Sequence, residues 1–101
     1  MSDPSVTLIN LLKVEPANQD ALIALLKQNT ENVIRGLDGW KSTRLIAADD
    51  GASVVIHSEW ESAAAVAAMR SDPRMRAYFP QVLALASLES IVGAAVLTQS
   101  R

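Results

Sequence analysis

The chain has 101 residues, of which half are hydrophobic and a fifth are charged, and its formal net charge is −2. This length allows one domain of one or two packed layers and excludes two separate cores. Nucleic acid is excluded as the main ligand, because phosphate binding needs clustered Lys and Arg, and here these residues are scattered singly. The absence of cysteine removes disulfides and thiol nucleophiles and is typical of a reducing compartment. Because no apolar run approaches the length of a membrane span, we expect a cytoplasmic protein without a membrane partner.

The first two predicted elements are a strand and a helix. Ser5 to Val14 reads SVTLINLLKV, a nearly continuous apolar run that favours a strand covered on both faces. From Pro16 onward the apolar residues recur at helical spacing. We expect this helix to begin at Asn18 or a neighbour and to end at Gly36.

Two strands joined by a hairpin come next. The segments from Gly39 to Ala48 and from Ala52 to Trp60 are both rich in apolar and β-branched residues. Asp49-Asp50-Gly51 joins them, with the Asp-Gly chemistry that hairpin turns prefer. These two strands are therefore predicted to be antiparallel neighbours.

Two short helices and a final strand complete the predicted elements. Ser62 is expected to begin the first helix. Asp72 is placed to cap the second, with Pro73 at the first helical position, where its missing N–H costs nothing. Pro80 is expected to kink or divide this second helix. The apolar segment from Leu88 to Thr98 is the predicted last strand.

The resulting order is that of an α+β, ferredoxin-like βαββαβ domain, with an antiparallel sheet and helices on one face. One such domain spans residues 1–101, with a core of about residues 5–98. The strands are apolar on both faces, so the face away from the helices needs a cover. We expect a second copy to provide it, in a homodimer that closes a joint α/β barrel.

The strands also predict a site. The first and third strands are neighbours at the centre of this fold, and side chains alternate along each strand. Asn10 and Trp60 then present polar donors on one apolar wall, which is typical of a small-molecule pocket. The alternative is that Asn10 bonds to nearby backbone and Trp60 is simply core. The residues that share this wall are Leu8, Asn10 and Leu12 of the first strand and Val54, Ile56, Ser58 and Trp60 of the third.

Several segments together resemble a known family. They are VTLINLLKV at the start, Gly-Leu-Asp-Gly-Trp before the second strand, GASVVIHSEWES, and AAAVAAMRSDPRMRAY. The chain resembles the antibiotic biosynthesis monooxygenase (ABM) family over almost its entire length. Within that family it is similar to the cofactor-independent anthrone oxygenases of aromatic polyketide pathways.

The resemblance implies a small homodimeric enzyme that oxidises an aromatic phenol-, anthrone- or quinol-like molecule with O2 and uses neither metal nor flavin. It also implies catalytic roles for Asn10 and Trp60, which match the asparagine and tryptophan of that branch. A fold does not fix an activity, so a second hypothesis stays open. In this second hypothesis, the chain is a non-catalytic dimeric module that binds small molecules or serves in stress responses.

The sequence departs from the family pattern at three places. Ile56 stands where the anthrone oxygenases have a second asparagine, and Val66 stands where one member has a tyrosine. Tyr78 and Phe79 stand near the histidine that the haem-degrading branch needs, so haem is disfavoured. We expect Val66, Tyr78 and Phe79 to bind substrate from the helices that cover the sheet.

The remaining titratable residues have alternative interpretations. His57, the single histidine, is predicted on the strand face opposite Trp60, which favours an interface or structural role. A lone histidine is also a poor metal site, so no metal is expected. Arg70, Arg74 and Arg76 either meet an acidic substrate at a pocket mouth or are solvated and paired with nearby carboxylates.

Overall fold

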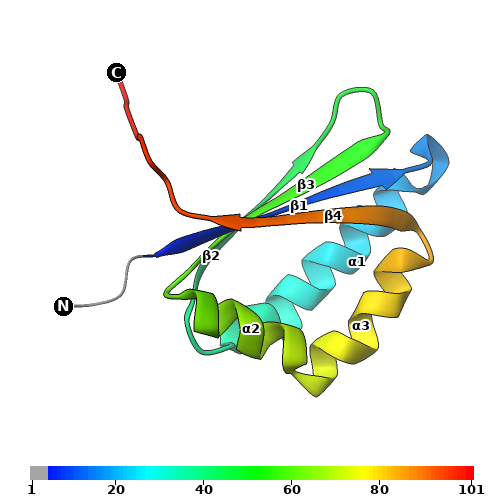
Figure 1. The fold of residues 1–101 in the computed structure, drawn as a ribbon. Helices are drawn as coiled ribbons and strands as arrows, with labels where there is room; N and C mark the ends of the chain where they lie inside the picture. The colour runs from blue at the N-terminus through cyan, green and yellow to red at the C-terminus, as the bar shows by residue number, and fades with distance from the viewer. Residues whose placement is uncertain (1–4) are drawn as a thin grey trace.

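The computed structural model describes residues 5–101 and consists of an antiparallel sheet with helices on one face (Figure 1). The predicted α+β ferredoxin-like βαββαβ order is confirmed. Met1 to Pro4, with which the predicted domain begins, lie outside the described residues. The strands are β1 (Val6–Val14), β2 (Trp40–Ala47), β3 (Ser53–Trp60) and β4 (Ala86–Gly93), in the spatial order β2-β3-β1-β4. The helices are α1 (Gln19–Asn32), α2 (Ala63–Ser71) and α3 (Pro73–Leu83), with 3-10 turns η1 (Pro16–Asn18) and η2 (Ile34–Gly36) on either side of α1.

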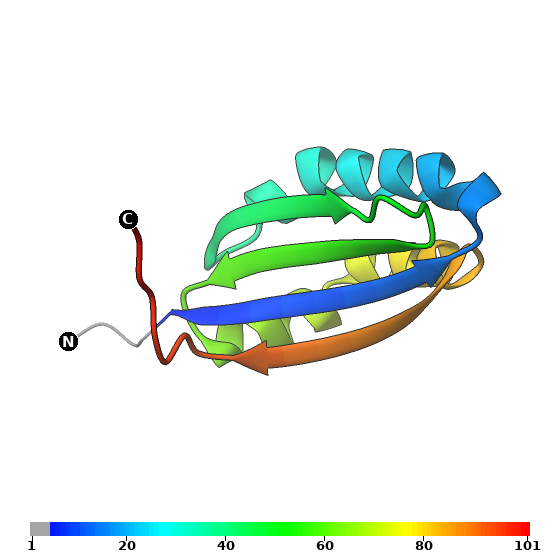
Figure 2. The same cartoon turned by 90° about the horizontal axis from the view of Figure 1, so that it is seen from above.

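The helices form one layer and the sheet forms the other. Figure 2 shows the strands in front of the helices, so that the sheet face turned to the viewer carries none of the helices of residues 5–101. We call this the outer face and the helix-covered side the inner face. No helix in this described range is long and apolar enough to cross a membrane.

The register of β1 determines which side chains reach the inner face. Leu8 and Leu12 are 3% and 0% exposed, and they face the helix layer. Since alternate residues share a face, Asn10 lies between them on the inner face. β1 pairs with β3 on one side and with β4 on the other, and Asn10 stands opposite Ile56 and Ser90.

Side-chain caps begin the two short helices, as predicted. The Ser62 hydroxyl accepts a hydrogen bond from the backbone N–H of Ala65 at 3.1 Å. The Asp72 carboxylate accepts one from the backbone N–H of Arg74 at 2.8 Å, and Pro73 takes the first helical position. Both caps satisfy amide groups that an α-helix leaves unpaired at its start.

Pro80 does not divide α3, so that part of the prediction was wrong. The helix is continuous from Pro73 to Leu83, and the N–H of Ala84 donates to the Pro80 carbonyl at 3.0 Å. A proline removes one helical hydrogen bond. Tyr78 and Val82, which are buried on either side of it, hold this part of the helix against the core.

The predicted ends of two elements also differ from the structure. Helix α1 ends at Asn32 rather than at Gly36, because Val33 leaves the helical conformation before the turn η2. Strand β4 spans Ala86–Gly93 rather than Leu88–Thr98. Within residues 5–101, β1 pairs with β4 from Thr7↔Gly93 to Val14↔Ala86, and the apolar residues after Gly93 form no pair with β1 in this range.

Gly39 brings the start of β2 close to α2. Its φ of +85° lies in the left-handed region, and an added Cβ would stand 2.5 Å from the Cβ of Ala65. The Gly39 carbonyl also accepts a hydrogen bond from the N–H of Glu61 at 2.8 Å. Only glycine satisfies this combination of backbone conformation and contact.

We therefore expect Gly39→Ala to lower the free energy of unfolding by about 2 kcal/mol or more, because strain at positive φ adds to overpacking against α2. Urea unfolding measures the change. Gly36→Ala is the matched control, since an added Cβ there meets nothing within 4 Å. Equal stability of the two variants would contradict the packing argument.

Candidate active site

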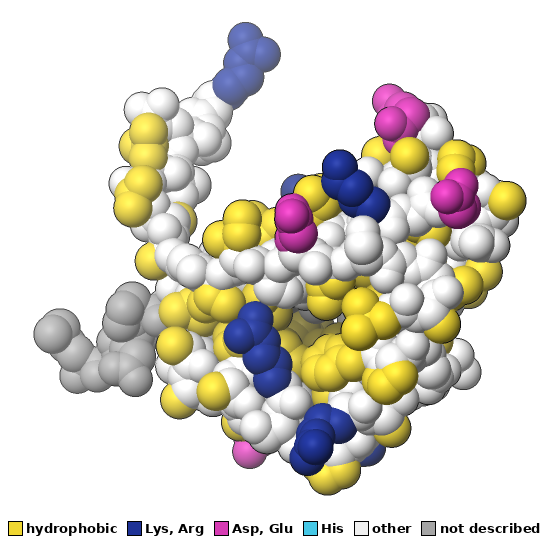
Figure 3. Space-filling view, turned by 45° about the vertical axis from the view of Figure 1, so that its right-hand side comes forward, with side chains coloured by type: hydrophobic (Ala, Val, Ile, Leu, Met, Phe, Trp, Pro, Cys, Tyr) yellow, Lys and Arg dark blue, Asp and Glu magenta, His cyan; other side chains and the backbone are white. Residues whose placement is uncertain are grey.

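A cavity of about 60 Å³ lies between the inner face of the sheet and the helices. On the face drawn in Figure 3, hydrophobic side chains gather around a hollow, and Lys or Arg side chains lie beside it. The cavity lining is mostly apolar, with a few polar groups from the strands and from α3. This make-up is typical of sites for small molecules.

Eight of the ten residues predicted for the site line this cavity. Val54 and Val66 do not; they are 1% and 2% exposed and belong to the core cluster. The eight are Leu8, Asn10, Leu12, Ile56, Ser58, Trp60, Tyr78 and Phe79.

The cavity also includes residues that the sequence did not single out. They come from α1, η2, β2, α2, α3 and β4, so most elements of the chain contribute. Six of the seven are apolar, and apolar character predicts burial but not which residues border a cavity. These residues are Leu26, Ile34, Thr43, Met69, Met75, Val82 and Leu88.

Asn10 is held by a neighbour on β4. The Ser90 hydroxyl donates a hydrogen bond to Asn10 Oδ1 from the directly opposite position in the sheet. This contact fixes the orientation of the amide and leaves Nδ2 with its donors. Among residues 5–101, Asn10 Nδ2 has no hydrogen-bond acceptor, so it is available to a ligand in the cavity. Alternation along β4 is the signal that points to Ser90 once its register is known.

Trp60 contributes its ring rather than a free donor. Its side chain is 1% exposed, and the indole Nε1–H donates to Ser58 Oγ at 3.1 Å. The Ser58 hydroxyl in turn donates to the Leu8 carbonyl at 3.4 Å. The prediction of two free donors on one wall therefore applies to Asn10 alone, since the indole N–H already donates to Ser58 on the same strand, β3.

Other candidate residues lie away from the cavity. His57 is on the outer face, as its parity predicts, and its Nε2 lies 3.3 Å from Glu59 Oε1. Arg74 pairs with Asp72 at 3.0 Å, and these hydrogen bonds hold the pKa of the Asp72 carboxyl below its usual value. Arg70 and Arg76 are exposed. Residues 5–101 contain no cluster of three or more His, Cys, Asp or Glu suited to a metal ion.

Tyr78 is the ionisable side chain in the cavity lining. It is 8% exposed, and burial raises the pKa of its hydroxyl well above the usual value. The phenol is therefore neutral at physiological pH, and it can donate a hydrogen bond.

The raised pKa of Tyr78 also predicts how stability depends on pH. The folded protein keeps the proton where the unfolded chain loses it, so stability is lost as pH rises above about 10. Urea unfolding at about pH 9 and 11 measures how far the free energy of unfolding falls between these pH values. We expect this fall to be smaller in Tyr78→Phe. Since Tyr78 is the only tyrosine in the chain, its tyrosinate absorbance reports the pKa directly. A midpoint near 10 would contradict the effect of burial.

Sequence comparison identifies relatives of the chain. Residues 5–81 match the family described as Antibiotic biosynthesis monooxygenase. The tetracenomycin-F1 monooxygenase of Streptomyces glaucescens is 38% identical over 73 residues. The match covers 72% of this chain and 65% of that protein, slightly less than two thirds of its length.

Solved structures share the fold over nearly the whole chain. Rv0793 from Mycobacterium tuberculosis has a TM-score of 0.81 and 28% identity, and the match covers 95% of this chain and 99% of that one. SnoaB, a cofactor-independent oxygenase from Streptomyces nogalater, has a TM-score of 0.81 over 97% of this chain and 99% of its own, at 21% identity. At 21% identity, the likeness to SnoaB shows a shared fold and no more. From the sequence match, the chain belongs to the antibiotic biosynthesis monooxygenase family.

Proposed function

We propose that the protein is a cofactor-independent monooxygenase that oxidises an aromatic phenol-, anthrone- or quinol-like molecule with O2. The observation that carries the proposal is the Asn10 amide, which is oriented by Ser90 and has free donors on the wall of an apolar cavity. The names of the relatives support it, because one is a monooxygenase and another a cofactor-independent oxygenase.

The reaction balances without a further reductant. For an anthrone, the methylene carbon becomes a carbonyl, one atom of O2 enters the product, and the other leaves as water. The methylene gives up the four electrons that the O2 molecule accepts. Its two hydrogens leave in the water. The substrate therefore supplies the reducing power, and the protein has to promote formation of the reactive anion.

Asn10 Nδ2 is placed to stabilise that anion. A donor held in advance in a site with little water stabilises developing negative charge strongly. The phenolate or enolate oxygen of the substrate accepts this hydrogen bond, which favours ionisation. Trp60 and Phe79 provide aromatic surface for the ring system. In the described chain the cavity lining contains no carboxylate, imidazole or amine, so the substrate has to be acidic enough to ionise with water as proton acceptor.

Oxygen uptake with a panel of anthrones and hydroquinones tests this function. We expect Asn10→Ala to lower kcat by about 10²- to 10³-fold, the usual effect of deleting one donor to an oxyanion. Trp60→Phe keeps much of the ring surface and should cause a smaller decrease.

Asn32→Ala is the matched control for the asparagine variant, because Asn32 is exposed on α1 and does not line the cavity. Unchanged uptake in Asn10→Ala would contradict the assigned site. Binding of the panel without any uptake would favour the non-catalytic binding module of the same fold.

We also infer a homodimer joined through the outer face. This face carries an apolar group that spans all four strands, and two of its members, Ile46 and Ile91, are 46% and 67% exposed. Exposed apolar area of this kind is typical of subunit contacts. In a symmetric dimer, the outer face of each copy covers the outer face of the other. The group consists of Ile9, Leu11, Ile46, Val55 and Ile91.

Light scattering is expected to give twice the chain mass of 10.8 kDa at micromolar concentration. Ile91→Asp should shift the protein toward monomer, because it places a charge in the covered face. Leu83→Asp is the control, since Leu83 is an exposed leucine on α3, away from the outer face. A monomeric parent protein would contradict the proposed dimer.

A further inference from the structure

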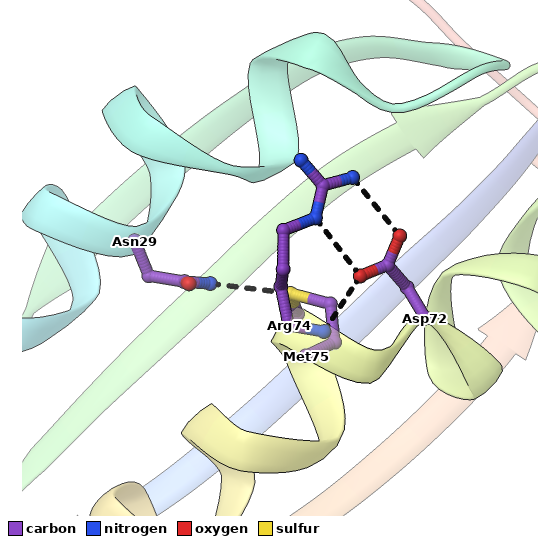
Figure 4. Close-up of polar contacts among 4 residues, drawn as sticks. All are labelled: Asn29, Asp72, Arg74 and Met75. Atoms are coloured by element: carbon purple, nitrogen blue, oxygen red, sulfur yellow. Dashed lines mark hydrogen bonds and ion pairs between the residues drawn. The ribbon is translucent and has the colours of Figure 1, made fainter.

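A buried amide on α1 fixes a methionine on α3. Asn29 is 6% exposed, and its Nδ2 donates to the Met75 Sδ at 3.3 Å (Figure 4). Buried amides are nearly always hydrogen-bonded, but a thioether is a weak acceptor. The contact therefore gives Asn29 Nδ2 a partner through a weak hydrogen bond. It also holds the otherwise flexible Met75 side chain in one position.

This contact lies in the wall between two hollows. On one side, Met75 lines the 60 Å³ cavity of the candidate active site. On the other side, Asn29 lines a groove of about 290 Å³ between α1 and α3. Tyr78 borders both. A change in the Met75 side chain would therefore connect the cavity with the groove.

The cavity is too small for the proposed substrates as it stands. An apolar cavity of about 150 Å³ holds a single benzene ring, and sites for larger ligands have about 300 Å³ or more. The 60 Å³ of this cavity must expand to admit a fused ring system. Methionine, with three rotatable bonds, is the kind of wall residue that can move at low cost.

A side-chain cap stabilises the first turn of the helix that carries Met75. Arg74 donates from its backbone N–H to Asp72 at 2.8 Å and from its guanidinium at 3.1 and 3.0 Å (Figure 4). These contacts stabilise the first turn of α3 immediately before Met75. Rotation of the Met75 side chain leaves this turn intact, so we assign the expansion to the side chain.

We propose that Asn29 and Met75 form a latch that sets the size of the active-site cavity. Single-ring ligands need only a small expansion, to about 150 Å³, that leaves the latch closed, whereas fused-ring ligands bind only when Met75 leaves Asn29 and the cavity opens toward the α1–α3 groove. Asn29 is thus a specificity-determining residue that acts through Met75. This inference rests on the proposed function for its aromatic class of substrate.

Anaerobic binding of phenol, 1-naphthol and anthrone tests the latch without turnover. In Asn29→Leu, fused-ring ligands no longer have to break the hydrogen bond. We expect the Kd for anthrone to fall about two- to tenfold, the equivalent of one weak hydrogen bond, while the Kd for phenol stays the same. Asn29→Ala also removes the donor and is the second variant if leucine disturbs folding.

A double-mutant cycle separates the latch from a general structural effect. Met75→Leu conserves volume and removes the sulfur acceptor, so Asn29→Leu should cause no further change in that background. Asn32→Leu, the same substitution at an exposed position in the same groove, should leave the ratio of the two Kd values unchanged.

An unchanged Kd ratio in Asn29→Leu, or an equal shift in the Met75→Leu background, would overturn the latch. The same experiments test the proposed function separately from the latch. A shifted ratio without oxygen uptake by any variant would support the latch and contradict the oxygenase. Oxygen uptake with an unshifted Kd ratio would support the oxygenase and contradict the latch.

Discussion

The alternation of side chains along β1 is the constraint on which the site depends. Leu8 and Leu12 are almost completely buried against the helices, and they fix the register of β1 between β3 and β4. A slip of one residue would move every side chain to the opposite face. Asn10 would then lie on the outer face, away from Trp60. The apolar core and the polar site therefore depend on the same register.

Three polar side chains at or near the cavity are positioned by a partner on another element or on the same strand. Ser90 on β4 orients Asn10, Ser58 accepts from Trp60, and Met75 on α3 accepts from Asn29 on α1. In an apolar environment such groups cost free energy unless they are bonded, and bonding also fixes their direction. Asn10 differs from the others, because within residues 5–101 its Nδ2 keeps unused donors at the cavity wall. This asymmetry distinguishes a group available for chemistry from groups that stabilise the wall.

The helix layer determines how much space remains above the sheet. Gly39 allows α2 to lie close to the start of β2, and the Asp72 cap begins α3. Between these anchors the layer leaves only about 60 Å³, part of it bordered by methionines. A rigid backbone with adaptable side chains reconciles a small empty cavity with binding of a larger aromatic molecule.

The sequence by itself determined the order of the elements, the caps at Ser62 and Asp72, and the face that carries Asn10 and Trp60, because these follow from local periodicity and local hydrogen bonding. Only the tertiary structure decided where β4 ends, since its last residue pair with β1 is Thr7↔Gly93. It also decided that Val54 is core whereas Ile56 borders the cavity, although both share one strand face. A cavity is the space that distant elements fail to fill, so neither its lining nor the contacts of Ser90 and Met75 can be predicted from spacing along one segment.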